Sequence, residues 1–161
     1  MGILLWCAAA SITAFAAFAV RGRGTGGQFE FLLYSSLLSV YLVLDDCLRF
    51  HEGLEGRFGV DEKVTCALLG IAVIAYLVVF REMILTTRWQ MLVASLLLLA
   101  ISIVVDQAAS LLIAGGVPGW GLLEDGFKLL GIAAWLSYMV TAAYRLMTSA
   151  LWPGSGATRT L

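Results

Sequence analysis

The chain alternates long apolar runs with short polar or glycine-rich stretches. A helix that crosses a membrane needs about 20 mostly apolar residues. Five runs approach or exceed that length, and they cover residues 2–20, 29–50, 64–80, 89–113 and 122–151. The stretches between them hold turn-forming residues, as in the glycine-rich link 21–27 and around Pro118 and Pro153. The pattern predicts one all-α domain over residues 1–152, a bundle of five membrane-spanning helices, and a short polar tail at 153–161.

The composition agrees with a membrane location. Hydrophobic residues make up 61% of the chain and charged residues 13%, whereas roughly a quarter of a soluble domain is charged. The first apolar run has no basic residue before it and is followed by Arg21 and Arg23, the reverse of a secretory signal, so we expect it to be retained as a helix. The net charge is −1, so no basic field attracts nucleic acid. We expect an integral protein of a bacterial inner membrane, in contact with lipid.

The basic residues predict an orientation. If the five runs alternate in direction, one side of the membrane receives six arginines: Arg21, Arg23, Arg81, Arg88, Arg145 and Arg159. Cytoplasmic loops carry an excess of lysine and arginine, so this side is expected to be cytoplasmic. The N-terminus is then expected outside and the C-terminus inside.

The acidic residues gather toward the opposite, outer side. Nine of the 11 acidic residues fall there: Asp45, Asp46, Glu52, Glu55, Asp61, Glu62, Asp106, Glu124 and Asp125. Asp46 and Asp106 each follow the first residue of their apolar run by 17 positions, which is ~25 Å along a helix. The fifth run carries Glu124, Asp125 and Lys128 in its first two turns. Three helices are therefore expected to bring charge to one depth.

Helical spacing also places these charges on polar stripes. The expected stripes are Asp45, Arg49 and Glu52 beside Ser35, Ser39 and Asp46 on the second helix; Ser95, Ser102 and Asp106 on the fourth; and Glu124, Lys128, Gly131 and Trp135 on the fifth. Ionisable residues inside a membrane avoid lipid and point into the bundle or into a wet cavity. The simplest packing turns the three stripes toward one another.

A carboxylate-rich cluster of this kind predicts a cation or proton site near the outer face. The expected binding residues are Asp46, Asp106, Glu124 and Asp125, assisted by His51 and Glu52, with Asp45, Arg49 and Lys128 balancing charge. A divalent metal could be held by Asp46, His51, Asp106 and Glu124. Oxygen ligands favour Ca²⁺, Mg²⁺ or Mn²⁺, and the imidazole keeps Fe and Zn open. With the serine stripes as a polar path, the protein would act as a transporter or channel-like protein.

Other interpretations of the same residues stay open. Asp45 with Arg49, and Glu124 with Lys128, have the i, i+4 spacing of structural ion pairs within one helix. The small size and the alanine-rich first helix also suit an accessory or assembly subunit of a larger membrane complex, or a homo-oligomer. A metal-dependent enzyme acting on lipid is a further alternative, although catalysis would need an open coordination position.

The tryptophans have two predicted roles. Trp6, Trp89, Trp120 and Trp152 fall near helix ends, where interfacial anchors are expected. Trp135 and Tyr138 lie deeper, and we expect them to pack in the core rather than to line a ligand cavity.

Overall fold

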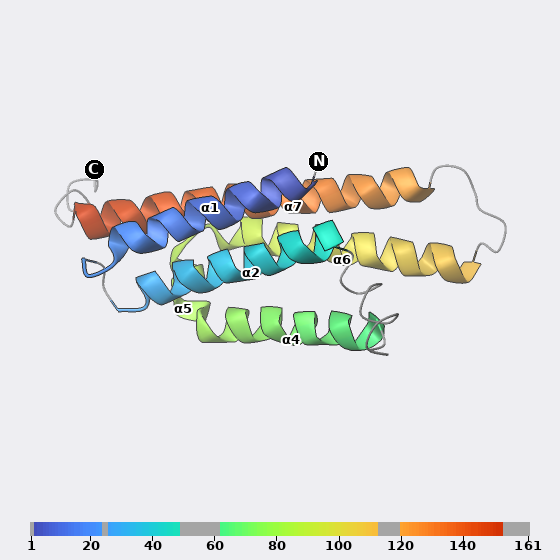
Figure 1. Ribbon diagram of the computed structural model, residues 1–161, viewed down its shortest axis with the longest axis horizontal. Coiled ribbons are helices and arrows are strands. Elements are labelled where there is room, and N and C mark those ends of the chain that lie inside the picture. Colours follow the sequence, from blue (N-terminus) through green and yellow to red (C-terminus); the bar gives the residue numbers. More distant parts are fainter. Residues whose placement is uncertain (1, 24–25, 49–61, 113–119, 153–161) are drawn as a thin grey trace.

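The computed structural model describes residues 2–23, 26–48, 62–112 and 120–152, and all regular structure in these ranges is helical. The helices are α1 (Gly2–Val20), α2 (Gln28–Leu48), α4 (Glu62–Val79), α5 (Arg81–Thr86), α6 (Trp89–Leu112) and α7 (Trp120–Leu151) (Figure 1). The all-α fold is confirmed, and the five long helices begin and end within two residues of the apolar runs. The short helix α5 was not predicted, and the tail at 153–161 lies outside the described residues.

Three of the described helices are long and apolar enough to cross a membrane, with spans at Gly2–Val20, Trp89–Asp106 and Gly121–Leu151. α2 does not belong to this group. It carries Glu30, Asp45 and Asp46 near its ends and three buried serines between them. In α4 the uninterrupted apolar stretch, Ala67–Val79, is shorter than a full span.

The packing of α1 follows side-chain size rather than polarity. Its buried face consists largely of small residues, among them Ala9 and Ala16, each with no exposed surface. Large apolar residues point away from the bundle instead: Leu4 is 74% exposed, Phe15 69% and Phe18 61%. Small residues let helix backbones approach closely where lipid, not water, surrounds the bundle. The size pattern is therefore the one expected of a membrane helix.

A glycine-containing turn reverses the chain between α1 and α2. The backbone amide of Arg23 donates to the carbonyl of Val20 at 3.0 Å, which closes the end of α1. Gly22 and Gly27 have φ angles of 75° and 93°, a left-handed conformation that costs a side chain with a Cβ about 1 kcal/mol or more. The turn lays α2 back along α1.

The core lies where α1, α2, α6 and α7 meet. α1 packs against both α2 and α7, and α6 packs along α7 (Figure 1). Trp135, 1% exposed, meets the edge of Trp6 with ring centroids 5.8 Å apart. Tyr138, on the same helix as Trp135, is fully buried. The core role of Trp135 and Tyr138 is confirmed. The interfacial role of Trp6 is wrong, because its ring is only 3% exposed and packs inside the bundle.

α4 lies at the edge of the bundle beside α2 (Figure 1). It is attached through aromatic rings near its end: Tyr76 stacks on Phe31 of α2, with centroids 5.8 Å apart, and Phe80 contacts both Phe31 and Tyr34. Along the rest of α4 most apolar side chains are exposed, including Leu68, Ile71, Ile74 and Val78.

Candidate functional site

One ion pair connects the predicted stripes of α2 and α7. The Nζ atom of Lys128 lies 2.5 Å from Oδ1 of Asp46, and the Asp46 side chain is only 17% exposed. A Cβ atom added to Gly2 would lie 3.1 Å from Oδ2 of Asp46, so the carboxylate also reaches the first turn of α1. The N-terminal end of a helix, where backbone N–H groups are unpaired, favours a negative charge. Asp46 therefore pairs with α7 and lies close to the first turn of α1, at the acidic end of the bundle.

Two further acids, Asp106 and Asp125, act on Glu124 of α7. The hydroxyl of Ser102 on α6 donates to the backbone carbonyl of Glu124 at 3.2 Å. Asp106 follows Ser102 by one helical turn, and the charges of Asp106 and Asp125 repel the Glu124 carboxylate whereas that of Lys128 attracts it. The predicted approach of the α6 and α7 stripes is thus observed near Ser102.

The two groups occupy neighbouring levels. Lys128, which binds Asp46, follows Glu124 by four residues on α7, so the levels are ~6 Å apart along the helix. Asp46 is partly buried against α1 and α7, whereas Asp106 and Asp125 are exposed. Asp45 is half-buried on α2 next to Asp46. The remaining predicted site residues, Arg49, His51 and Glu52, lie outside the described residues.

No described group of three or more histidine, cysteine, aspartate or glutamate side chains is arranged to hold a metal ion. Instead, Asp46 forms an ion pair with Lys128, and Glu124 feels the like charges of Asp106 and Asp125.

The buried serines join helices to one another. The hydroxyl of Ser39 on α2 accepts a hydrogen bond from Nε1 of Trp135 on α7 at 3.1 Å and donates to the carbonyl of Ser35. Ser95 on α6 donates to the carbonyl of Gly131 on α7 at 2.8 Å. These bonds satisfy each hydroxyl inside the bundle, which is how membrane helices commonly use serine.

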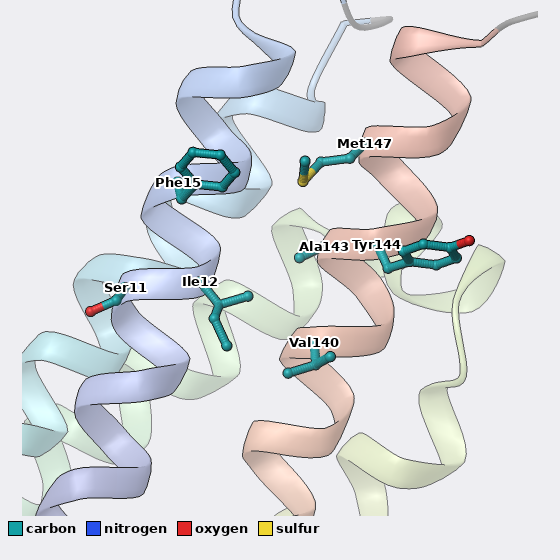
Figure 2. A pocket seen from close by; sticks show the side chains of 7 residues that line it. All are labelled: Ser11, Ile12, Phe15, Val140, Ala143, Tyr144 and Met147. Atoms are coloured by element: carbon teal, nitrogen blue, oxygen red, sulfur yellow. The ribbon is translucent and has the colours of Figure 1, made fainter.

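Two apolar grooves on the sides of the bundle were not predicted. The larger, about 640 Å³, lies between α2 and α4. The smaller, about 360 Å³, lies between α1 and α7, where Ile12, Val140 and Met147 point between the helices while Tyr144 points away (Figure 2). The only available signal was helical spacing, as at Tyr34, Leu37, Leu38 and Tyr41. In helices that are apolar on most sides, that spacing does not single out one face.

Comparison with known proteins identifies a family whose function is unknown. No curated protein and no solved structure matches the chain. The model of one family, described as a domain of unknown function (DUF8692), matches residues 1–142, a range that runs from α1 into α7. The chain therefore belongs to the DUF8692 family.

Proposed function

We propose that the protein is an integral membrane protein that crosses the bilayer five times and carries a proton or cation site at its outer end. Helix lengths support five crossings. α2 has 21 residues and α4 has 18, which correspond to ~31 Å and ~27 Å, close to the ~30 Å of hydrocarbon in a bilayer. The charged residues of α2 lie near its ends, apart from the middle of the bilayer, where charge is most costly.

The orientation rests on the arginines. Arg21, Arg23, Arg81, Arg88 and Arg145 are all exposed and lie near the ends of helices that meet at one end of the bundle, where α1, α4 and α7 finish. Arg145 also donates from Nη1 to the backbone carbonyl of Thr86 at 3.4 Å. An excess of arginine favours the cytoplasmic side, so the end with Asp46 and Glu124 faces outward.

The proposed site is centred on Asp106 and Glu124, with Asp125 beside them and the Asp46–Lys128 pair one turn deeper. The observation that carries it is the hydrogen bond from Ser102 to the backbone carbonyl of Glu124, which brings the end of α6 that carries Asp106 beside the start of α7 that carries Glu124 and Asp125. The like charges of Asp106 and Asp125 act on Glu124 there. A bound cation or a proton would relieve the repulsion between these carboxylates. His51 and Glu52 would assist from the segment after α2. Each buried serine among the described residues takes part in a hydrogen bond between or within helices, so the proposal is limited to binding.

The test is the effect of cations and pH on thermal unfolding in mild detergent. We expect Ca²⁺, Mg²⁺ or Mn²⁺, or a fall in pH, to raise the Tm of the wild-type protein. Asp106→Asn and Glu124→Gln should each remove most of this increase, because each substitution removes one of the repelling charges. Glu82→Gln is the matched control, since Glu82 is an exposed carboxylate at the opposite end. Equal responses in the wild type and in Asp106→Asn would disprove the site.

Elemental analysis of the purified protein separates the two occupants. About one metal per chain, lost in Glu124→Gln, would identify a metal. A pH response without bound metal would identify a proton.

A second candidate function, an accessory subunit of a larger membrane complex, is favoured by the exposed apolar surface of α4. Ile71 and Ile74 are more than 60% exposed on a helix that is held to the bundle mainly at its end. Stoichiometric partners that purify with the wild type and are lost in Ile71→Ser would support this role. A lone species in mild detergent would oppose it.

A further inference from the structure

The junction of α5 and α6, residues 86–89, is held on α7 by two contacts. The hydroxyl of Thr87 donates to the carbonyl of Ile84 at 2.7 Å and is hydrogen-bonded to the hydroxyl of Tyr138 at 3.0 Å. Arg145 donates from Nη1 to the carbonyl of Thr86 at 3.4 Å. Tyr138 and Arg145 are seven residues apart on α7, so they lie on one face of that helix. The position of the junction on α7 is therefore set at two levels.

This junction brings arginines from three helical elements to one part of the surface. Arg88 stands between α5 and α6, two residues after the carbonyl that Arg145 contacts, and Arg81 begins α5. All three side chains are exposed. Within the described part of the chain, none of them forms an ion pair with a carboxylate, although Glu82 is adjacent in sequence. The junction therefore carries an excess of positive charge that the described residues leave unpaired.

Exposed apolar side chains alternate with these arginines. Leu85 follows Arg81 by four residues, so the two share one face of α5. Leu85 is 64% exposed on that face, whereas Ile84 is buried against the bundle. Trp89 follows Arg88 directly and is 42% exposed, and tryptophan is enriched where hydrocarbon meets the polar head groups. The junction thus presents guanidinium groups and apolar side chains on one surface.

A ligand that matches this surface has a phosphate next to hydrocarbon. Guanidinium groups donate paired hydrogen bonds to phosphate oxygens. Arg145 uses Nη1 on the carbonyl of Thr86, and its other N–H groups remain for a ligand. A zwitterionic head group also carries an ammonium group, which the arginines would repel, whereas an anionic phospholipid carries none. Free phosphate would meet the arginines but would leave Leu85 and Trp89 without a partner.

We propose that Arg88 and Arg145, with Arg81 beside them, bind the phosphate of an anionic phospholipid whose acyl chains contact Leu85 and Trp89. The inference rests on the membrane-spanning arrangement proposed above and is independent of the cation site at the acidic end. The arginines that favour the cytoplasmic side would then also select a lipid there. That lipid would be retained more strongly than the bulk lipid around the protein.

Native mass spectrometry of the full chain in mild detergent tests this proposal. The probe is palmitoyl-oleoyl phosphatidylglycerol, and palmitoyl-oleoyl phosphatidylethanolamine is the comparison lipid. We expect the wild type to retain phosphatidylglycerol in preference. Arg88→Gln and Arg145→Gln should each lower its retention by about fivefold, the effect of one basic residue near an anionic membrane surface, and leave that of phosphatidylethanolamine unchanged. Arg23→Gln is the matched control, because Arg23 is an exposed arginine on the turn between α1 and α2. Inorganic phosphate should not displace the lipid.

Arg88→Gln decides the test if Arg145→Gln fails to fold by Tm and size-exclusion chromatography, because the exposed Arg88 side chain forms no hydrogen bond or ion pair with the described residues. Equal retention of phosphatidylglycerol in the wild type and in folded Arg88→Gln would overturn the proposal. So would an equal loss in Arg23→Gln, which would indicate a diffuse positive field, or displacement by inorganic phosphate, which would identify a free anion as the ligand. Release of the protein from membranes by alkaline carbonate would instead refute the membrane-spanning proposal. Firm membrane association without a preference for phosphatidylglycerol would refute the lipid site alone.

Discussion

At the scale of single residues, the contact between Asp46 and Lys128 connects two helices that are far apart in sequence. The Lys128 side chain is 44% exposed, so solvent screens part of the attraction. Asp46 is more enclosed and lies against the first turn of α1 at Gly2. Removal of Lys128 should therefore cost more stability than removal of Asp46. It leaves the enclosed carboxylate without its partner, and an unpaired charge is more costly where it is buried.

We predict that Asp46→Asn and Lys128→Met each lower the Tm, and that the double variant loses less than the sum of the two. The coupling free energy should be about 1 kcal/mol, as for partly exposed ion pairs. Thermal unfolding of all four proteins in one detergent measures it. Lys128→Met combined with Glu82→Gln should be additive, since those residues lie at opposite ends of the bundle. Additive losses for Asp46→Asn and Lys128→Met would show that the contact stabilises nothing.

The sequence predicted which charged residues lie at this end of the bundle, but not which of them form ion pairs with each other. Helical spacing placed Lys128 in reach of Glu124 on its own helix, but in the structure its salt bridge is with Asp46. The choice depends on the separation of α2 and α7, which the close packing of both against α1 sets and which no local pattern encodes. Trp6 was misjudged for a related reason: a position near a helix end does not reveal which side of the helix is covered.

At the scale of the helices, α6 and α7 meet closely at Gly131. A Cβ atom added there would lie 2.8 Å from Cγ of Leu99 and 3.1 Å from its backbone nitrogen. The carbonyl of Gly131 also accepts the hydrogen bond from Ser95. The two helix backbones can lie this close together only because Gly131 has no side chain.

We predict that Gly131→Ala destabilises the bundle by about 1–3 kcal/mol, because α6 must shift to admit the new methyl group. Gly126→Ala is the control on the same helix. A Cβ atom there meets nothing within 4 Å, so the gain in helix propensity should leave stability unchanged or slightly higher. Chemical or thermal unfolding in detergent compares the two variants. Equal Tm values would mean that α6 and α7 are not held together at Gly131.

Helix boundaries were predictable because each apolar run ends at charged, glycine or proline residues. The buried face of α1 was harder to predict, because the helix is apolar on nearly every side. Only the size of its side chains distinguishes the inner face. The alanines gave a hint of close packing, which Ala9 and Ala16 confirm. The helix α5 has six residues, too few for a periodic pattern to reveal it.

At the scale of the whole molecule, charge divides the bundle into two ends. The exposed arginines lie where α1, α4 and α7 finish, and the described carboxylates on α6 and at the start of α7 lie at the other end. Between these ends the surface is largely apolar, with residues such as Phe15, Ile71 and Ile74 more than 60% exposed. An apolar band between two charged ends is the arrangement that a bilayer selects.

The measurement that tests this account most directly is labelling of single cysteines with a membrane-impermeant maleimide in intact cells. Three variants are compared, each without the other native cysteines: native Cys47 alone, Thr86→Cys and Gly121→Cys. Cys47 and position 121 are exposed near the acidic end, and Thr86 is exposed at the arginine-rich end. We predict labelling of Cys47 and Gly121→Cys from outside, and of Thr86→Cys only after the membrane is opened. Labelling of Thr86→Cys in intact cells, or of all three alike, would contradict the crossing of α4 and α6 and the proposed orientation.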